Sequence, residues 1–130
     1  MALLLAIAAP KAGETHAFGL QWIDGIGVAT VSDDGGKTVV MGKHTGKDGD
    51  FISINGAIEQ PSETGFTFVG VIVTRVSHIA GGKACTRKGT FTFRATGKRR
   101  YWRMKENGNP CDGAADYVDI YFEREERSFA

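Results

Sequence analysis

The chain has 130 residues, with 16 basic and 15 acidic side chains and a formal net charge of +1. That length fits one domain, and an apolar content of 42% is enough to bury a core, which excludes a disordered chain and a two-domain architecture. A nucleic-acid binder is disfavoured, because such a domain normally carries excess positive charge as a whole. Eighteen glycines and only three prolines are typical of many tight turns between strands.

The first part of the chain is similar to an export leader. Leu3–Ala9 is an apolar run, a polar stretch follows, and Thr15 and Ala17 place small residues at the positions that precede a cut. We therefore expect residues 1–17 to be a leader cleaved after Ala17, and residues 18–130 to form one domain. No basic residue precedes the apolar run, so a short buried strand or a frayed terminus is the alternative. The run is too short to span a bilayer, and we expect no transmembrane span.

Alternation of apolar and polar residues with period two follows, punctuated by glycine and aspartate turns. We expect strands, in chain order, at 21–31, 38–44, 51–59, 66–77, 90–96, 99–106 and 116–124. The fourth is apolar on both faces, which predicts that it is covered on both sides. Evenly spaced strands with short turns predict an all-β fold, an antiparallel up-and-down β-barrel of about seven or eight strands, with a β-sandwich as the alternative.

The most unusual stretch runs from Lys83 to Lys105 and carries nine basic residues and no acidic one. Residues 106–130, in contrast, carry seven acidic and two basic side chains. Adjacent strands of opposite charge predict cross-strand ion pairs as well as a binding surface. The nine cations are Lys83, Arg87, Lys88, Arg94, Lys98, Arg99, Arg100, Arg103 and Lys105.

Gly97-Lys98 is typical of a two-residue hairpin turn with glycine first. In that register Phe93 faces Trp102, and Phe91 faces Met104. In the following hairpin, Trp102 is then expected beside Ile120 of the last strand. The expected inner layer is Phe91, Phe93, Trp102, Met104, Val118, Ile120 and Phe122.

The outer face of the same hairpins follows by alternation. Arg103 is expected beside Asp119, and Arg99 beside Glu123. Tyr101 is expected between Arg94 and Tyr121. Arg100 is expected to point inward near the turn, at the rim, since an unpaired buried charge is too costly.

Two cysteines, Cys85 and Cys111, frame the basic stretch. In a meander both lie at the same end of the sheet, so we expect a disulfide that ties two long loops together. Two unrelated thiols in a cytosolic protein are the alternative. Together with the leader, the bridge predicts a periplasmic or secreted protein.

No stretch of the sequence carries a catalytic or metal-binding motif. His16, His44 and His78 lack the spacing of zinc ligands. Asp116 and Asp119 are a candidate carboxylate pair for glycoside chemistry, but alternation turns Asp119 toward an arginine instead. We therefore expect no catalytic residue, no metal and no cofactor, and a protein that is not an enzyme.

The cations left without a predicted partner favour a binding role, and a solvated, partly self-paired face is the alternative. We expect binding by Arg87, Lys88, Arg100, Tyr101 and Trp102. The expected partner is a small ligand, an acidic envelope protein or a glycan. Nucleic acid is not expected, because two or three of the interleaved aromatic residues face the core.

The chain resembles small exported β-barrels of the lipocalin and avidin kind, and periplasmic lysozyme inhibitors, in its size, the even spacing of its strands and its single expected disulfide. This likeness implies an architecture and not a function. We predict an exported, non-catalytic binding protein of the bacterial envelope or exterior that binds at the barrel mouth and the cysteine-end loops. The alternatives are a small hydrolase or cyclase-type barrel enzyme and a structural envelope component.

Overall fold

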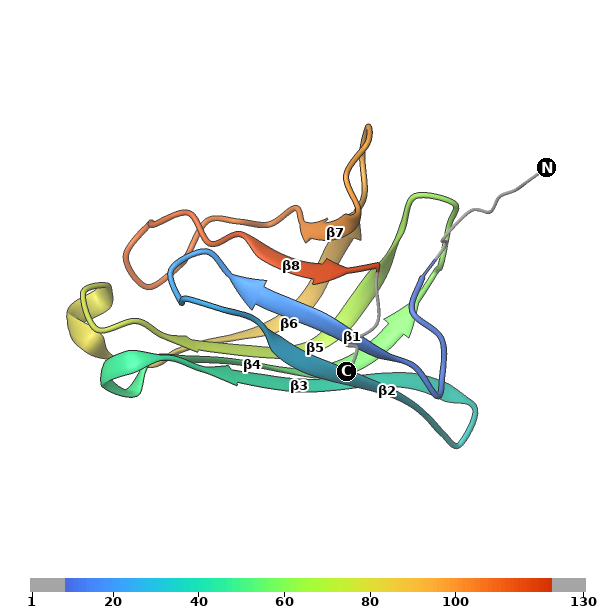
Figure 1. Cartoon of the computed structure of the whole chain (residues 1–130), viewed down its shortest axis with the longest axis horizontal. Coiled ribbons are helices and arrows are strands. Elements are labelled where there is room, and N and C mark those ends of the chain that lie inside the picture. The colour runs from blue at the N-terminus through green and yellow to red at the C-terminus, as the bar shows by residue number, and fades with distance from the viewer. Residues whose placement is uncertain (1–8, 123–130) are drawn as a thin grey trace, which may run out of the picture.

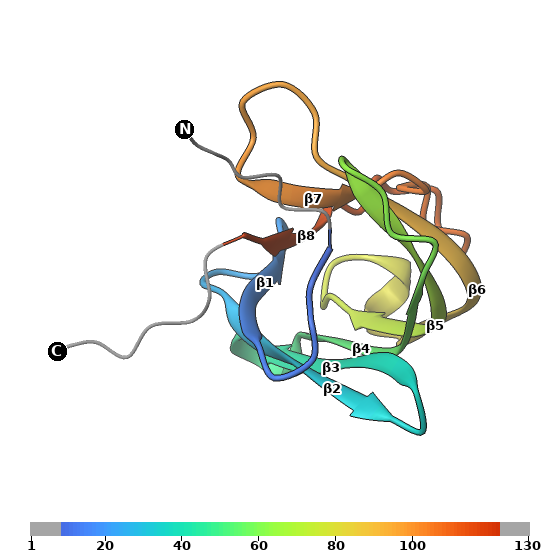
Figure 2. The same ribbon diagram turned by 90° about the vertical axis from the view of Figure 1, so that its right-hand side faces the viewer.

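The computed structural model describes residues 9–122, which form a closed antiparallel barrel in which each strand pairs with the next. Figures 1 and 2 show the strands following one another around a ring. β8 returns to pair with β1, with Phe18 opposite Ile120. The predicted all-β barrel is confirmed, and the closing pair excludes the sandwich. The strands are β1 Thr15–Leu20, β2 Gly27–Asp34, β3 Lys37–Thr45, β4 Phe51–Glu59, β5 Gly65–Arg75, β6 Cys85–Arg94, β7 Tyr101–Met104 and β8 Val118–Tyr121.

The two ends of the barrel differ in the loops that they carry. Loops 21–26, 46–50, 76–84 and 105–117 lie at one end, named here the cysteine end, and they include the short 3-10 turns Lys47–Gly49 and Ala80–Gly82. The opposite end carries the β2–β3 turn, loop 60–64 and loop 95–100. The cysteine end lies on the left in Figure 1, and loop 95–100 rises at the top.

The interior of the barrel is filled with side chains. Alternation along each strand sends every second residue inward, and Trp102, Phe18 and Phe68 are fully buried there. The predicted inner layer is confirmed, because its six members from Phe91 to Ile120 are buried and Phe122 packs against them. Eight strands leave an interior just wide enough for such side chains, so the barrel centre is a core.

The tight curvature of the wall depends on glycines that face inward. Gly56 and Gly70 are opposite each other on β4 and β5. A Cβ atom added at Gly70 would lie 2.3 Å from the Asn55 carbonyl oxygen and 2.5 Å from the Gly56 Cα. The two strands therefore approach here in a way that no other residue permits.

Two predicted strands differ from those observed. The single strand expected at 21–31 is wrong, because residues 15–20 form β1 and residues 21–26 form a loop before β2. Gly25 in that loop has a φ of 82°, a conformation that favours glycine and is incompatible with a continuous strand over 21–31. The sixth observed strand begins at Cys85 and not at Thr90, since its pairing with β5 continues to the disulfide.

The predicted cleavage after Ala17 falls inside β1. Thr15, His16 and Ala17 pair with Thr30, Ala29 and Val28 of β2. A cut at that point would remove the first half of the strand that closes the barrel, and the cleavage itself stays a prediction. Most of the apolar run at Leu3–Ala9 lies outside the described residues.

The predicted register of the hairpin formed by β6 and β7 is wrong by two residues. Phe93 faces Met104, and Arg94 faces Arg103, because residues 95–100 form a longer loop and not a two-residue turn. A shift of two residues keeps every side chain on its predicted face. In the next hairpin the predicted pairs of Trp102 with Ile120 and of Tyr101 with Tyr121 are confirmed.

The predicted disulfide is confirmed. Cys85, at the start of β6, is bonded to Cys111 in loop 105–117, and their Cα atoms are 6.1 Å apart. The bridge joins two long segments at the cysteine end, as expected. A disulfide is typical of proteins that function outside the reducing cytosol. Among residues 9–122, no helix has the length and apolar character needed to cross a bilayer.

Candidate functional site: a basic groove over β6, β7 and β8

A groove of about 560 Å³ lies on the outside of the barrel wall where β6, β7 and the segment leading to β8 meet. Its volume falls within the range of small-molecule sites. Four of its eight lining residues are cationic, and none is a carboxylate or an imidazole. They are Arg94, Thr96, Arg99, Arg103, Met104, Lys105, Asn107 and Tyr117. We call this feature the basic groove.

Arg103 is held rigidly in the basic groove. Its Nε and Nη2 atoms donate to the two carboxylate oxygens of Asp119 at 2.8 and 2.9 Å. Its guanidinium carbon lies 4.5 Å from the ring centroid of Tyr117 and 5.2 Å from that of Tyr101. The hydrogen bonds to Asp119 raise the pKa of Arg103 above its ordinary value. The predicted pair is confirmed, and it leaves the Nη1 edge of a permanently charged group outside the bidentate contact.

Among residues 9–122, no carboxylate forms an ion pair with the other three cations. Arg94 is the direct cross-strand neighbour of Arg103, and like charges in that position are destabilising. Arg99 lies over the Tyr101 ring at 5.6 Å. Within residues 9–122, neither Arg94 nor Lys105 forms an ion pair, and both side chains are exposed. An anion in the groove would relieve the repulsion between these charges.

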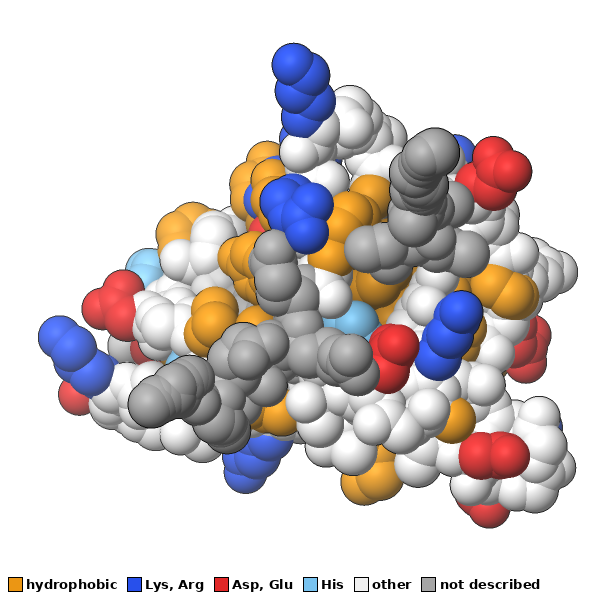
Figure 3. Space-filling view, turned by 45° about the vertical axis from the view of Figure 1, so that its right-hand side comes forward, with side chains coloured by type: hydrophobic (Ala, Val, Ile, Leu, Met, Phe, Trp, Pro, Cys, Tyr) orange, Lys and Arg blue, Asp and Glu red, His pale blue; other side chains and the backbone are white. Residues whose placement is uncertain are grey.

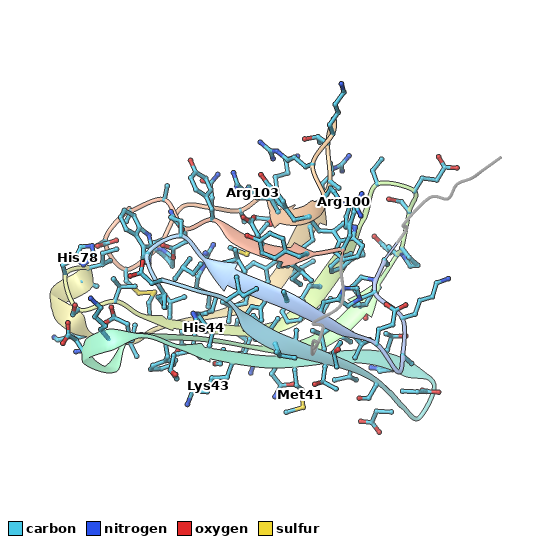
Figure 4. The ribbon with its side chains drawn as sticks, viewed as in Figure 1. Met41, Lys43, His44, His78, Arg100 and Arg103 are labelled. Atoms are coloured by element: carbon cyan, nitrogen blue, oxygen red, sulfur yellow. A yellow bond between two sulfur atoms is a disulfide. The ribbon has the colours of Figure 1, made fainter. Side chains whose placement is uncertain are left out.

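Figures 3 and 4 show how the basic groups stand on the molecule. Lys and Arg side chains project at the top of the space-filling view, where loop 95–100 lies. In the stick view, Arg100 and Arg103 lie near this upper wall, far from Met41 and Lys43 at the bottom. Lys and Arg side chains also project elsewhere in the space-filling view, and Arg103 of the basic groove lies on the upper wall.

A buried polar network holds the cysteine end of the groove. Asp116 is only 1% exposed, and it accepts hydrogen bonds from Trp22 Nε1 at 3.1 Å and Asn109 Nδ2 at 3.0 Å. Its backbone N–H donates to the Asn107 carbonyl, and the next N–H, of Tyr117, donates to Gln21 Oε1. Asn107 is thus held by a contact within loop 105–117, and Tyr117 by a contact between that loop and loop 21–26.

The same network predicts a pH dependence of stability. Burial raises the pKa of the Asp116 carboxyl above its ordinary value of 3.8, against opposing hydrogen bonds from Trp22 and Asn109 and the positive charge of Arg87. The folded state therefore binds this proton more tightly than the unfolded state does. The contribution of Asp116 to the free energy of unfolding is therefore largest below pH 3.8. It is lost as the pH rises from there through the raised pKa.

We expect the difference in unfolding free energy between the natural protein and Asp116→Asn to shift in favour of the variant as pH rises through that window. Each unit of pKa elevation corresponds to about 1.4 kcal/mol. Urea unfolding of both proteins between about pH 3 and pH 7 measures the difference. A difference that stays constant with pH would show that Asp116 titrates normally.

The residues predicted to bind a partner lie in different environments. Lys88 is exposed on the outer face of β6, and Tyr101 lies outward between the rings and guanidinium groups of β7 and β8. Arg100 contacts the Phe122 ring at 5.8 Å near the end of the loop. Trp102 is fully buried in the core and supports the wall from inside. The structure does not bring these residues together in one pocket.

Arg87 is not a surface cation. It points inward from β6 and is 9% exposed. Its Nη2 donates to the Glu106 carbonyl at 2.6 Å, and its guanidinium lies 5.4 Å from the Phe91 ring. Its Nη1 has no hydrogen-bond partner among residues 9–122. Arg87 therefore joins β6 to loop 105–117 from the inside.

The predicted barrel mouth at the cysteine end is closed. Ile23, Val76 and Ile79 from its loops are buried and belong to the core cluster. A hollow of about 220 Å³ lies at this end, with Trp22, Ile23 and His78 among its lining residues. The loops therefore form a lid of side chains, and the larger basic groove lies on the wall instead.

None of the five residues singled out for binding lines the basic groove, and sequence reasoning also missed Tyr117, Asn107 and Thr96. Alternation with Asp119 and Tyr121 could have placed Tyr117 on the outer face. Asn107 and Thr96 lie in loops, where period two gives no orientation. The candidate carboxylate pair separates, because Asp116 is buried under Trp22 while Asp119 binds Arg103. Among the described residues, no three His, Cys, Asp or Glu side chains are grouped to hold a metal ion.

Comparisons with known proteins relate this chain to one protein family. A sequence model of the PM1083 family matches residues 5–122, a range that includes all eight strands. A relative from Pasteurella multocida (strain Pm70), "Uncharacterized protein PM1083", is 48% identical over 109 residues, which is 82% of this chain and 71% of the relative. No solved structure matches the chain.

Proposed function

The chain belongs to the PM1083 family, and we propose that it is an exported, non-catalytic binding protein that captures a ligand with two or more anionic groups. The basic groove is the proposed site. Phosphate, sulfate and carboxylate groups share the chemistry that it would recognise, and such groups occur on a small ligand, a glycan or an acidic protein segment.

The observation that carries the proposal is the charge imbalance of the groove. Within the part of the chain that the structure describes, its four cations have one carboxylate as an ion-pair partner, that of Asp119, and both charge-assisted bonds of Asp119 go to Arg103. Arg94, Arg99 and Lys105 can therefore bind the anionic groups of a ligand. A ligand with a single negative charge would neutralise one of these cations, whereas a ligand with two negative charges would neutralise two of them.

Two further features support surface binding. The barrel interior is occupied by core side chains, so the wall offers the space that the interior does not. The rings of Tyr101 and Tyr117 are already covered by Arg103, which favours recognition by charge and hydrogen bonds over stacking. The lining has donors suited to oxyanions and lacks the paired groups of general acid–base chemistry.

Titration with chemically defined probes tests the proposal. We expect a sulfated disaccharide to shift the backbone amide signals of Arg94, Arg99 and Lys105 in NMR spectra at low ionic strength. The affinity should fall as salt is added, because exposed charges are screened. The same disaccharide without sulfate is the control and should leave these signals in place. Equal shifts with both sugars, or none with either, would overturn the assignment.

A further inference from the structure

The outer face of β2, β3, β4 and β5 exposes apolar side chains on the wall opposite the basic groove. Met41 is 55% exposed, Val28 39% and Val69 37%. Figure 4 shows Met41 and Lys43 pointing away from the barrel below β3. Val69 on the outer face of β5 is exposed among residues 9–122, so the expected cover on that side of β5 stays a prediction.

The register places apolar residues of β3, β4 and β5 in two neighbouring outward rows, with Asn55 in the second row, and Val28 lies beyond them opposite Lys43. Val39 of β3 lies opposite Ala57 of β4, which lies opposite Val69 of β5. Along the next outward row, Met41 lies opposite Asn55, and Asn55 opposite Val71. A patch formed by neighbours on several strands is typical of an interaction site, unlike single exposed apolar residues.

Charges at the two ends of this face are of opposite sign. Lys43 lies toward the cysteine end and is exposed. Asp34 and Glu59 are exposed at the opposite end of the same face. Lys37 lies between those two acids and directly opposite Asp34, so the net charge of that end is negative.

We propose that this face binds a second copy of the chain in a symmetric dimer. The two-fold axis lies between the two sheets and runs across the strands, so the faces meet with their strands antiparallel. The apolar rows of both copies then meet at the centre. Lys43 of each copy lies over the end of the other that carries Asp34 and Glu59. A single face that is apolar in the middle and oppositely charged at its ends is self-complementary in this arrangement.

The size of the face fits a dimer of modest affinity. Four strands about 4.8 Å apart, with about five outward positions about 6.8 Å apart, give a projected area of about 650 Å² per copy. The total of about 1,300 Å² is at the lower end of stable interfaces. β7 and β8 lie on the far side of the barrel from β3 (Figure 1). Both basic grooves would therefore stay open, and the dimer does not depend on what they bind.

A charge exchange tests the arrangement. Analytical ultracentrifugation over a range of concentrations should show a monomer–dimer equilibrium for the natural chain. Lys43→Glu and Glu59→Lys should each weaken the dimer by at least about tenfold. The double variant should regain most of the affinity, because these residues lie at opposite ends of one face and pair only between copies. A double variant no better than the single ones would overturn the antiparallel arrangement.

A second variant tests the apolar centre. Met41→Glu should leave a monomer at concentrations where the natural chain is dimeric. Ala115→Glu adds the same charge to an exposed loop position away from β2–β5 and should leave the dimer intact. Circular dichroism spectra of both variants should match that of the natural protein. A natural chain that is monomeric at every concentration, or a dimer unaffected by Met41→Glu, would refute the proposal.

Discussion

Replacing Arg94 and Lys105 together by glutamate should remove anion binding at the basic groove, with at least a hundredfold loss of affinity for a sulfated disaccharide. Hydrogen bonds to charged groups contribute about 1.5–3 kcal/mol each, so the loss of two such contacts suffices, and a factor of one hundred corresponds to about 2.7 kcal/mol. The reversed charges add repulsion to that loss. Both positions are exposed without an ion pair among residues 9–122, so the fold should tolerate the change.

The matched control changes the same charge outside the groove. Lys83 and Lys98 are exposed and do not line it, so Lys83→Glu with Lys98→Glu alters the net charge equally. We expect this control to weaken binding only severalfold, through the long-range field of the protein. Isothermal titration of both double variants with the sulfated disaccharide compares their affinities. An equal loss in both would mean that the groove has no specific role.

Removing the disulfide should be the most damaging single change to stability. The bridge spans a sequence separation of 26 residues, and the chain-entropy relation gives about 3.6 kcal/mol for a closed loop of that size. For a domain of this length that corresponds to a fall in Tm of about 10–15 °C. Replacing Cys85 and Cys111 by serine, and reducing the natural protein, should give similar losses in thermal unfolding.

The disulfide prediction also has a structural consequence at the groove. Cys111 lies in the loop that carries Asn107, and its N–H donates to Asn109 Oδ1 at 2.7 Å. Without the bridge, Arg87 and the Asp116 network still hold this loop, so we expect weaker anion binding and not its loss. A reduced protein with an unchanged Tm would contradict the stabilising role. The Arg94 and Lys105 variant, which keeps the bridge, separates the two effects.

Local patterns predicted the parts of the site that depend on alternation. The β7–β8 pairing followed from period two and one plausible register, and it placed Arg103 beside Asp119 correctly. The expected partner of Arg99, Glu123, lies outside the described residues. The β6–β7 register was wrong, because a Gly-Lys pair that can form a tight turn lies instead within a six-residue loop. Turn propensity is a local preference, and the strand pairing on both sides of the loop outweighed it.

The remaining features of the site depend on contacts distant in sequence. Asp116 receives its hydrogen bond from Trp22, a residue more than ninety positions earlier, and no periodic pattern links the two. Arg87 was expected at the surface within a loop. Once β6 extends to the disulfide, the parity of the strand turns Arg87 inward, where the Glu106 carbonyl compensates for part of its burial.

The sequence by itself determined the class of the fold, the inner and outer faces of the last three predicted strands and the partner of each cysteine. These follow from the two-residue period of strands and from the meeting of alternate loops at one end of a meander. The tertiary structure alone decided that the barrel mouth is closed and that the cations without an ion pair among the described residues lie together on the wall. Those outcomes depend on how the loops pack and on the β6–β7 register that places Arg94 beside Arg103. Both arise from the closure of the whole barrel.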